Sequence, residues 1–384
     1  MTIHKTAFST SLLAIACASP FAAASTPFNG QTTALSGAGI ATSEYSEGLV
    51  LNPAAPGRFR AEQDFNLHLN LGLEAADQDD LLDSAETLSD TLDRIEGQVP
   101  DTQTVEDVIG QLQAISGKRA NVRTGGGLYA SIPTESVTIS AFARTDMALG
   151  VVATTSDNDI ALLRAAAEDG VPFDTANLDS SVLATGAALS EGGIGFAREN
   201  GDLSYGATLK IQRVDVIEYR ARIDNFDEDN FDASEYRTDD TAFNLDLGVQ
   251  RRYGDWQFGA VLTDAFRKEH RSVSGREVVI EPRFAVGGGY RSGWFTAALD
   301  LDVNAAPNRV TGEDSQFARV GIELDAWDWA QLRFGYRSDI QSALADTVSA
   351  GIGLSPFGVM NMDLAVVAGE NDTVGVTVQA GLSF

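Results

Sequence analysis

The stretch LSYGATLKIQ, residues 203–212, shows the pattern that decides the fold. Its odd-numbered positions carry Leu, Tyr, Ala, Leu and Ile, and the positions between them carry Ser, Gly, Thr, Lys and Gln. Because successive side chains of a β-strand point to opposite faces, this segment has one apolar face and one polar face. Similar segments of about ten residues, separated by turn residues, recur along most of the chain. The chain is therefore expected to be all-β.

Two architectures produce this alternation, a soluble β-sandwich and a transmembrane β-barrel. The barrel is favoured because charges and small residues mix on the polar face and because short turns alternate with long loops. The chain also ends in VTVQAGLSF, residues 376–384, with Phe384 on the apolar parity. This end resembles the signal by which bacterial barrels are recognised by their assembly machinery, although an ordinary edge strand could also end in Phe. We predict an antiparallel transmembrane barrel of about fourteen strands.

The first 24 residues resemble a secretory signal peptide. An apolar stretch from Ala7 to Ala16 is followed by an A-x-A cleavage site at residues 22–24. This stretch is too short to span a bilayer. Cys17 raises the alternative of a lipoprotein, but Ala14 stands where that motif has Leu, so we expect cleavage after residue 24. The mature chain would then lack cysteine, and with it disulfides, thiolate catalysis and Cys-ligated metals.

The charge of the chain limits its partners. The formal net charge is −28 and no basic cluster is present, so direct binding to nucleic acid is not expected. The acidic loop at residues 224–232 invites a calcium interpretation, with Glu235 at the twelfth position from Asp224. Phe226 and Asp229, however, stand where an EF-hand loop has a ligand and a Gly. We therefore expect no dedicated metal site and no cofactor, but a solvated loop that shares divalent ions with lipopolysaccharide phosphate.

Residues 75–120 interrupt the strand pattern with helical periodicity. Leu81, Leu88, Leu92 and Ile95 recur at helical spacing, and the opposite face is strongly acidic. Strand parity places this insert outside the cell, between the first two strands, and a second helical insert is predicted at residues 157–168. Both are expected to cap the barrel mouth; docking of a partner is the alternative.

Residues 25–60 are too polar and too rich in glycine to form a core of their own, whereas a barrel this wide needs a filled lumen. We expect them to form a plug, followed by the barrel at residues 61–384. Within the plug, Pro53 has a fixed φ and Asn52 can hydrogen-bond to neighbouring backbone, so Asn52-Pro53-Ala54 is predicted to form a rigid bend. A purely structural turn and a gating element remain equal alternatives.

Two longer stretches resemble known families. GQTTALSGAGIATSEYSEGLVLNPAAPGRF, residues 30–59, resembles the plug region of the long-chain fatty-acid transporter (FadL-type) superfamily, which implies a plugged fourteen-stranded barrel. The acidic helical insert and the following GKRANVRTGGGLYASIPTESVTISAFARTDMAL, residues 117–149, resemble more particularly the TraF-type conjugal-transfer family of outer-membrane proteins. Thioredoxin-like TraF proteins are different, because a chain without cysteine cannot perform their redox chemistry.

In the fatty-acid transporters, a strand kink opens the barrel wall sideways. Pro282, inside the predicted strand 277–290, and the pair Gly192-Gly193 are candidates for such a lateral opening in this chain. A continuous wall with an ordinary bulge is the alternative.

The leading hypothesis is a plugged channel in the Gram-negative outer membrane that passes small, hydrophobic molecules without energy input. The alternative is a structural or assembly protein of conjugal transfer, whose loops dock envelope components. An enzyme is not expected: His68 lies on the lumen parity and His270 in a loop, and lumen pairing explains His68 better than a hydrolase site. The expected partners are outer-membrane lipid, lipopolysaccharide and the barrel-assembly machinery.

Overall fold

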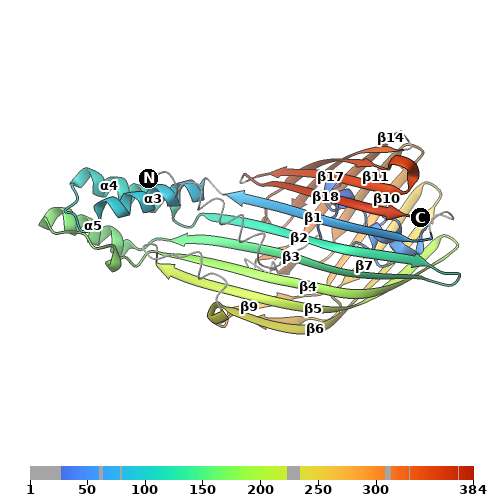
Figure 1. Ribbon diagram of the computed structural model, residues 1–384, viewed down its shortest axis with the longest axis horizontal. Helices are drawn as coiled ribbons and strands as arrows, with labels where there is room; N and C mark the ends of the chain where they lie inside the picture. The colour runs from blue at the N-terminus through green and yellow to red at the C-terminus, as the bar shows by residue number, and fades with distance from the viewer. Residues whose placement is uncertain are drawn as a thin grey trace.

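The computed structural model describes residues 27–59, 64–77, 80–222, 234–307, 313–327, 329–370 and 372–384. Fourteen antiparallel strands close into one barrel, in the order β1-β18-β17-β16-β15-β14-β11-β10-β7-β6-β5-β4-β3-β2 (Figure 1). The predicted all-β class and the strand number are confirmed. The signal peptide and the acidic loop at residues 224–232 lie outside the described residues.

Most strands follow one another around the wall, joined alternately by short turns and long loops. The barrel strands are β1 (Asn66–Asp77), β2 (Arg119–Pro133), β3 (Thr138–Thr154), β4 (Ser181–Asn200), β5 (Leu203–Arg222), β6 (Arg237–Tyr253), β7 (Trp256–Thr263), β10 (Arg283–Ser292), β11 (Phe295–Asp302), β14 (Phe317–Trp327), β15 (Ala330–Asp339), β16 (Thr347–Leu354), β17 (Met360–Gly369) and β18 (Val374–Ser383). Two small hairpins lie in the long loops: β8 (Lys268–Arg271) with β9 (Glu277–Ile280), and β12 (Ala306–Pro307) with β13 (Asp314–Ser315).

The helices belong to the plug or to the long loops. The plug contains α2 (Gly30–Ala34) and the short 3-10 helices η1 (Tyr45–Gly48) and η2 (Ala55–Gly57). The long loops contain α3 (Leu81–Ile95), α4 (Thr102–Ile115), α5 (Asp157–Asp169), η3 (Thr175–Asn177) and η5 (Ser234–Tyr236), and η6 (Pro356–Gly358) lies in the turn before β17. Among the described helices, none is long and apolar enough to cross a membrane.

The barrel surface reverses the usual rule of burial. On β5, Leu209 is 60% exposed, whereas the next residue, Lys210, is 4% exposed. On β6, Phe243 is 73% exposed beside the buried Asn244. Exposing large apolar side chains to water while burying charged ones would be unfavourable on both counts. The arrangement is stable only if the outer solvent is lipid and the charges line the lumen.

The apolar outer face has a definite upper limit. On β5 it runs from Leu203 to Ile211 and then gives way to Arg213 and Asp215, which form an ion pair of 3.0 Å. Arg213 also lies 3.4 Å from Asp239 on β6. About nine to eleven residues of tilted strand cross a bilayer, so this charged row marks the outer membrane boundary. The long strands β3 to β6 (Figure 1) therefore extend past this charged row as a tall wall.

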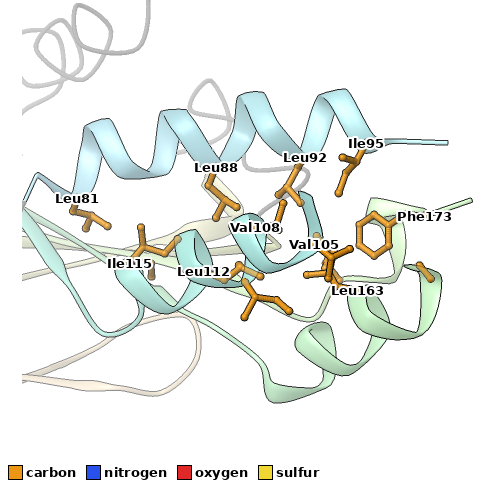
Figure 2. Packing of buried hydrophobic residues seen from close by; sticks show 14 of the residues in the cluster. Leu81, Leu88, Leu92, Ile95, Val105, Val108, Leu112, Ile115, Leu163 and Phe173 are labelled. Atoms are coloured by element: carbon orange, nitrogen blue, oxygen red, sulfur yellow. The ribbon is translucent and has the colours of Figure 1, made fainter. Parts of the chain in front are cut away.

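The three loop helices α3, α4 and α5 form one bundle beyond the ends of β1 to β4 (Figure 1). Their apolar faces meet in a core that the strand ends extend with Ala120 and Ala153 (Figure 2). Two backbone hydrogen bonds, Gly97 N–H to Phe173 O and Phe173 N–H to Gln98 O, join the two loops at the far end. The helical inserts predicted from periodicity are present, and they share a single core of their own.

One predicted strand was wrong. The segment 277–290, expected to be one strand, is divided into β9, which pairs with β8 in a loop, and β10, which belongs to the barrel. Pro282 lies between them, and its carbonyl accepts a hydrogen bond from Asn304 Nδ2 at 2.9 Å. A residue without an N–H is suited to such a link between two strands.

A charge introduced into the outer face tests the membrane assignment. Leu209→Arg is expected to lower the free energy of unfolding by about 2–4 kcal/mol, because a charged side chain would face acyl chains. The measurement is urea unfolding of the protein in lipid vesicles. Thr241→Arg, on the outward parity of β6 opposite Arg213, is the matched control and should cost about 1 kcal/mol or less. Equal costs for both substitutions would contradict the assignment.

A cavity in the bundle tests its independence. Leu112 is fully buried between the three helices, so Leu112→Ala should destabilise the bundle by about 2–5 kcal/mol. Because few bundle contacts reach the barrel, hydrogen exchange should accelerate in α3 to α5 and remain unchanged in the barrel strands. Faster exchange throughout the barrel would show that the two parts unfold together.

Candidate functional site

The lumen is occupied by residues 27–59, most of which are buried. Their hydrogen bonds reach strands on every side: Gly30 N–H donates to Gln379 on β18, Ser349 Oγ on β16 donates to Ala34 O, and Tyr45 Oη donates to the backbone of Ser131 on β2. This segment therefore forms a plug that is anchored around the barrel circumference rather than on one side of it.

The Asn52-Pro53-Ala54 bend is fixed by its own side chain. Asn52 is fully buried; its Nδ2 donates to Ile40 O at 2.9 Å and to Val249 O on β6 at 3.2 Å. Its Oδ1 accepts from Ala54 N–H at 3.0 Å, which is the local turn expected of Asn. On the other side of the bend, Ser204 Oγ on β5 donates to Ala54 O at 2.6 Å. The bend thus links two plug segments to β5 and β6.

The wall opposite this bend carries glycine because there is no room for a side chain. A Cβ atom at Gly206 would lie 1.9 Å from Pro53 O, and one at Gly248 would lie 1.9 Å from Asn52 Oδ1. Contacts this short cannot exist, so at these two positions only glycine allows the bend to lie so close to the wall. These seating residues were not identified from the sequence. The sequence did contain an indication of them, namely glycine at lumen-facing positions of long strands.

The middle of the plug is held by an acid of β11. Asp300 Oδ2 accepts the backbone N–H groups of Gly39 and Ile40 at 2.7 Å and 2.9 Å. From β6, Gln250 Nε2 donates to Ile40 O at 3.0 Å and to Ser43 O at 3.1 Å. Hydrogen bonds to an ionised acceptor are stronger than neutral ones. Asp300 and Gln250 therefore act as a clamp on this segment.

Arginines at the short-turn end fasten the other end of the plug. Glu44 lies 3.0 Å from Arg252 and 2.6 Å from Arg291, and Arg58 lies 3.6 Å from Glu199. These contacts connect the plug with β6, β10 and β4.

Above the plug, one side of the lumen is filled by a buried charge network. Lys210 Nζ lies 2.8 Å from Asp264, 2.9 Å from Asp246 and 3.2 Å from Glu191, and its side chain is almost completely buried. Burying an ammonium group is costly unless opposite charges surround it. Gln212 Nε2 adds hydrogen bonds to Glu191 and Asp264. This network joins β4, β5 and β6 to the end of β7.

Two small cavities lie on opposite sides of the plug. One, toward the long loops, is lined by Phe28, Arg123 and Arg337, and the other, toward the short turns, by Leu35 and Arg291 among others. Each has a volume of about 20 Å³, enough for one water molecule. A cavity that binds benzene has about 150 Å³. A molecule of that size can pass these two places only if the plug or its neighbours move.

The lateral opening expected at Gly192 and Gly193 was wrong. Both residues lie in an unbroken ladder: Gly192 pairs with Ala143 on β3 and with Ile211 on β5, without a change of register. Pro282, the other candidate, lies outside the barrel pairing. A strand tolerates glycine without breaking when its backbone hydrogen bonds are kept, so alternation disturbed by small side chains did not mean a broken wall.

The wall is held differently where β6 and β7 separate. Their backbone pairing ends at Leu247 and Leu262. Beyond this point, the side chain of Asn244 hydrogen-bonds to the chain that follows β7. Its Oδ1 accepts from Phe266 N–H at 3.0 Å and its Nδ2 donates to Phe266 O at 3.1 Å. Ala265 N–H also donates to Leu245 O at 2.9 Å. The seam therefore remains closed at this height.

The two histidines among the described residues, His68 and His270, occupy structural positions. His68 stacks on Tyr129 with ring centroids 4.9 Å apart, and its Nδ1 lies 3.1 Å from Asn66 Oδ1. His270 is in β8, where its Nδ1 lies 3.4 Å from Asp240. Within the part of the chain that the structure describes, no cluster of three or more His, Cys, Asp or Glu residues is arranged to hold a metal ion.

Comparison with known families supports the sequence resemblance. The family model described as "F plasmid transfer operon, TraF, protein" matches residues 49–302, which is more than half of the chain. The chain belongs to this TraF family. No curated protein sequence matches it.

Solved structures share the fold of this TraF family member. The Pseudomonas putida toluene transporter TodX aligns with a TM-score of 0.56 and 12% identity, covering 93% of this chain and 99% of its own. The CymD monoaromatic hydrocarbon channel aligns with a TM-score of 0.56 and 12% identity, covering 93% of this chain and 98% of its own. Identities this low show a common fold, which is the plugged fourteen-stranded barrel expected from the FadL-type resemblance.

Removal of the Asn52 amide tests the seat of the plug. Asn52→Ala leaves Ala54 N–H and two carbonyls without this partner, a loss of about 1–3 kcal/mol. Hydrogen exchange of residues 27–59 should accelerate, and open-channel events in planar bilayers should become more frequent. Asn158→Ala, in the exposed bundle, should change neither quantity. Unchanged exchange of the plug in the Asn52 variant would mean that the bend does not hold it.

Proposed function

We propose that this protein is a plugged channel of the Gram-negative outer membrane, through which small hydrophobic molecules pass without energy input. The observation that carries the proposal is the barrel with an apolar outside, a charged inside and a plug seated across its lumen. A purely structural anchor does not require a lumen with a separately clamped plug. The fold shared with channels described as carrying toluene or monoaromatic hydrocarbons supports the choice of substrate class.

The proposed membrane supplies the partners of the outer surface. Acyl chains would cover the apolar band, and lipopolysaccharide would meet the charged row that begins at Arg213. Phe384 directly follows β18, the strand that closes the barrel against β1, and its backbone N–H donates to Phe65 O at 2.8 Å. This position suits the proposed role of the last strand as the assembly signal, because β18 pairs with β1 where the two ends of the sheet meet.

We propose no catalytic role for this chain. The structures that share its fold are channels. His68 is enclosed by aromatic rings and an amide, and these neighbours supply neither a nucleophile nor a carboxylate for acid–base work.

A second candidate, docking of a conjugal-transfer component, is favoured by the bundle. The bundle has its own core and stands beyond the strand ends, which a channel alone does not require. Its segments 80–119 and 155–180 contain fifteen acidic and four basic residues, so a partner would need a basic surface. Membership of the TraF family supports this candidate as well.

Flux measurements test the channel. In vesicles with a lipopolysaccharide outer leaflet, which slows the passage of apolar molecules, the wild-type protein should accelerate the entry of toluene while passing little ionic current across a planar bilayer. Removal of residues 25–60 should raise the current, provided that the shift of the barrel in unheated gels shows that it is still folded. Absence of toluene entry with the wild type, together with no current in either form, would overturn the proposal. Loss of mating without loss of toluene flux after substitution of bundle surface residues would favour the second candidate.

A further inference from the structure

The lumen face of β5 changes from polar to apolar near its upper end. Lys210 and Gln212 are followed on the same parity by Val214 and Val216, and Leu189 of β4 pairs with Val214. Lumen faces of outer-membrane barrels are normally polar. The three apolar residues, here called the vestibule patch, are therefore not explained by the wall itself.

The vestibule patch lies above the membrane. The outward-facing neighbours of these valines are Arg213 and Asp215, which form the charged row at the outer boundary of the apolar band. The patch is thus on the inside of the tall wall, between the cell exterior and the buried network around Lys210. A molecule that enters from outside would meet it before it reached the plug.

The β8–β9 hairpin covers this patch. Val278 and Ile280 of β9 are 2% and 1% exposed, and they belong to the same buried cluster as Leu189, Val214 and Val216. Thr238, on the lumen parity of β6, donates from Oγ1 to Arg271 O at 2.6 Å, which places the hairpin on the inner side of the wall.

The tip of the hairpin is attached to one carboxylate. Ser272 Oγ and Ser274 Oγ donate to Glu218 Oε2 on β5, at 2.5 Å and 2.7 Å. Arg276 lies 3.8 Å from the same oxygen. Glu218 is on the lumen parity, two residues beyond Val216, so the attachment holds β9 directly over the patch.

The hairpin is too small to be stable by itself. β8 and β9 pair over four residues each, and an isolated two-stranded hairpin is marginal in water at best. Its chain links are also short: it follows β7 through Asp264, which has a φ of 53°, and returns to β10 through Pro282. Its folded position therefore depends on its contacts with the wall, which are the polar attachment at Glu218 and the apolar contact with the vestibule patch. A competing apolar surface can replace the apolar contact.

We propose that the vestibule patch is the entry site for apolar small molecules and that the β8–β9 hairpin is a displaceable lid which occupies the site until such a molecule arrives. This inference rests on the proposed channel function and adds the place of first binding and its control. The apparent affinity for an apolar molecule is then the affinity of the uncovered site multiplied by the fraction of protein molecules in which the lid is open. Weakening the lid and weakening the wall must then have opposite effects.

Two matched double variants separate these effects in the same vesicles with a lipopolysaccharide outer leaflet, with toluene as the probe. Val278→Ser with Ile280→Ser removes the apolar side chains by which the hairpin covers the patch and leaves the wall unchanged. Toluene entry at low concentration should then rise about tenfold, which corresponds to a loss of about 1.4 kcal/mol in the stability of the closed lid. Val214→Ser with Val216→Ser removes the same kind of surface from the wall, and toluene entry should fall. Both variants must show the gel shift of a folded barrel.

A second readout follows the lid itself. Saturating toluene should accelerate hydrogen exchange of residues 268–280 in the wild type and leave exchange of the bundle helix α4 unchanged. Two results would overturn the lid while leaving the channel intact, provided that the wild type passes toluene. One is that toluene entry changes in the same direction in both double variants. The other is that toluene does not change hydrogen exchange of the hairpin. No toluene entry with the wild type would overturn the lid, and, together with no current in either form of the plug experiment, it would overturn the channel as well.

Discussion

The backbone ladder between β1 and β18 is the interaction on which the rest of the structure depends. It joins the first and last strands from Asn66 opposite Ser383 to Ala75 opposite Val374. In lipid, an unpaired strand edge leaves N–H and C=O groups without water, at a cost of several kcal/mol for each group. Closure is therefore required before any apolar side chain can face acyl chains, and it forces the alternate side chains into a confined interior.

That interior explains the composition of both the wall and the plug. Alternate wall residues cannot reach lipid, so they bear charges and amides, which must find partners within the lumen. The plug supplies many of them as backbone groups, as at Asp300, where two plug N–H groups satisfy one carboxylate oxygen. Where the plug backbone itself touches the wall, glycine replaces the polar residue, as at Gly206 and Gly248. Wall and plug are thus complementary in hydrogen bonding and in volume.

The sequence predicted what depends on local periodicity. Alternation along residues 203–212 gave the strand and its lipid face, and helical spacing between Leu81 and Ile95 gave α3. It could not give what depends on partners distant in the chain. Nothing local at Asp300 indicates that it binds Gly39 and Ile40, because that contact is created by closure of the barrel.

The same limit explains the misassigned strand at residues 277–290. The alternation of β9 continues into β10 with only Glu281 and Pro282 between them, so a loop hairpin and a barrel strand look alike in sequence. Their separation is decided by register, since β10 must align with β7 and β11 while β9 aligns with β8. Similarly, Gly192-Gly193 interrupts the alternation in the sequence and so suggested a break in the wall, although the pairing there is continuous.

The architecture also shows how one chain can belong to a transfer family and share the fold of hydrocarbon channels. The bundle buries its apolar residues within itself, with Leu88, Leu112 and Leu163 among three helices, so its surface can change without repacking the lumen. The barrel residues that hold the plug, among them Asp300, Gln250 and Ser204, are not part of the bundle core. Because the bundle core and the plug contacts involve different residues, the outward surface can differ between family members while the plugged barrel fold is kept.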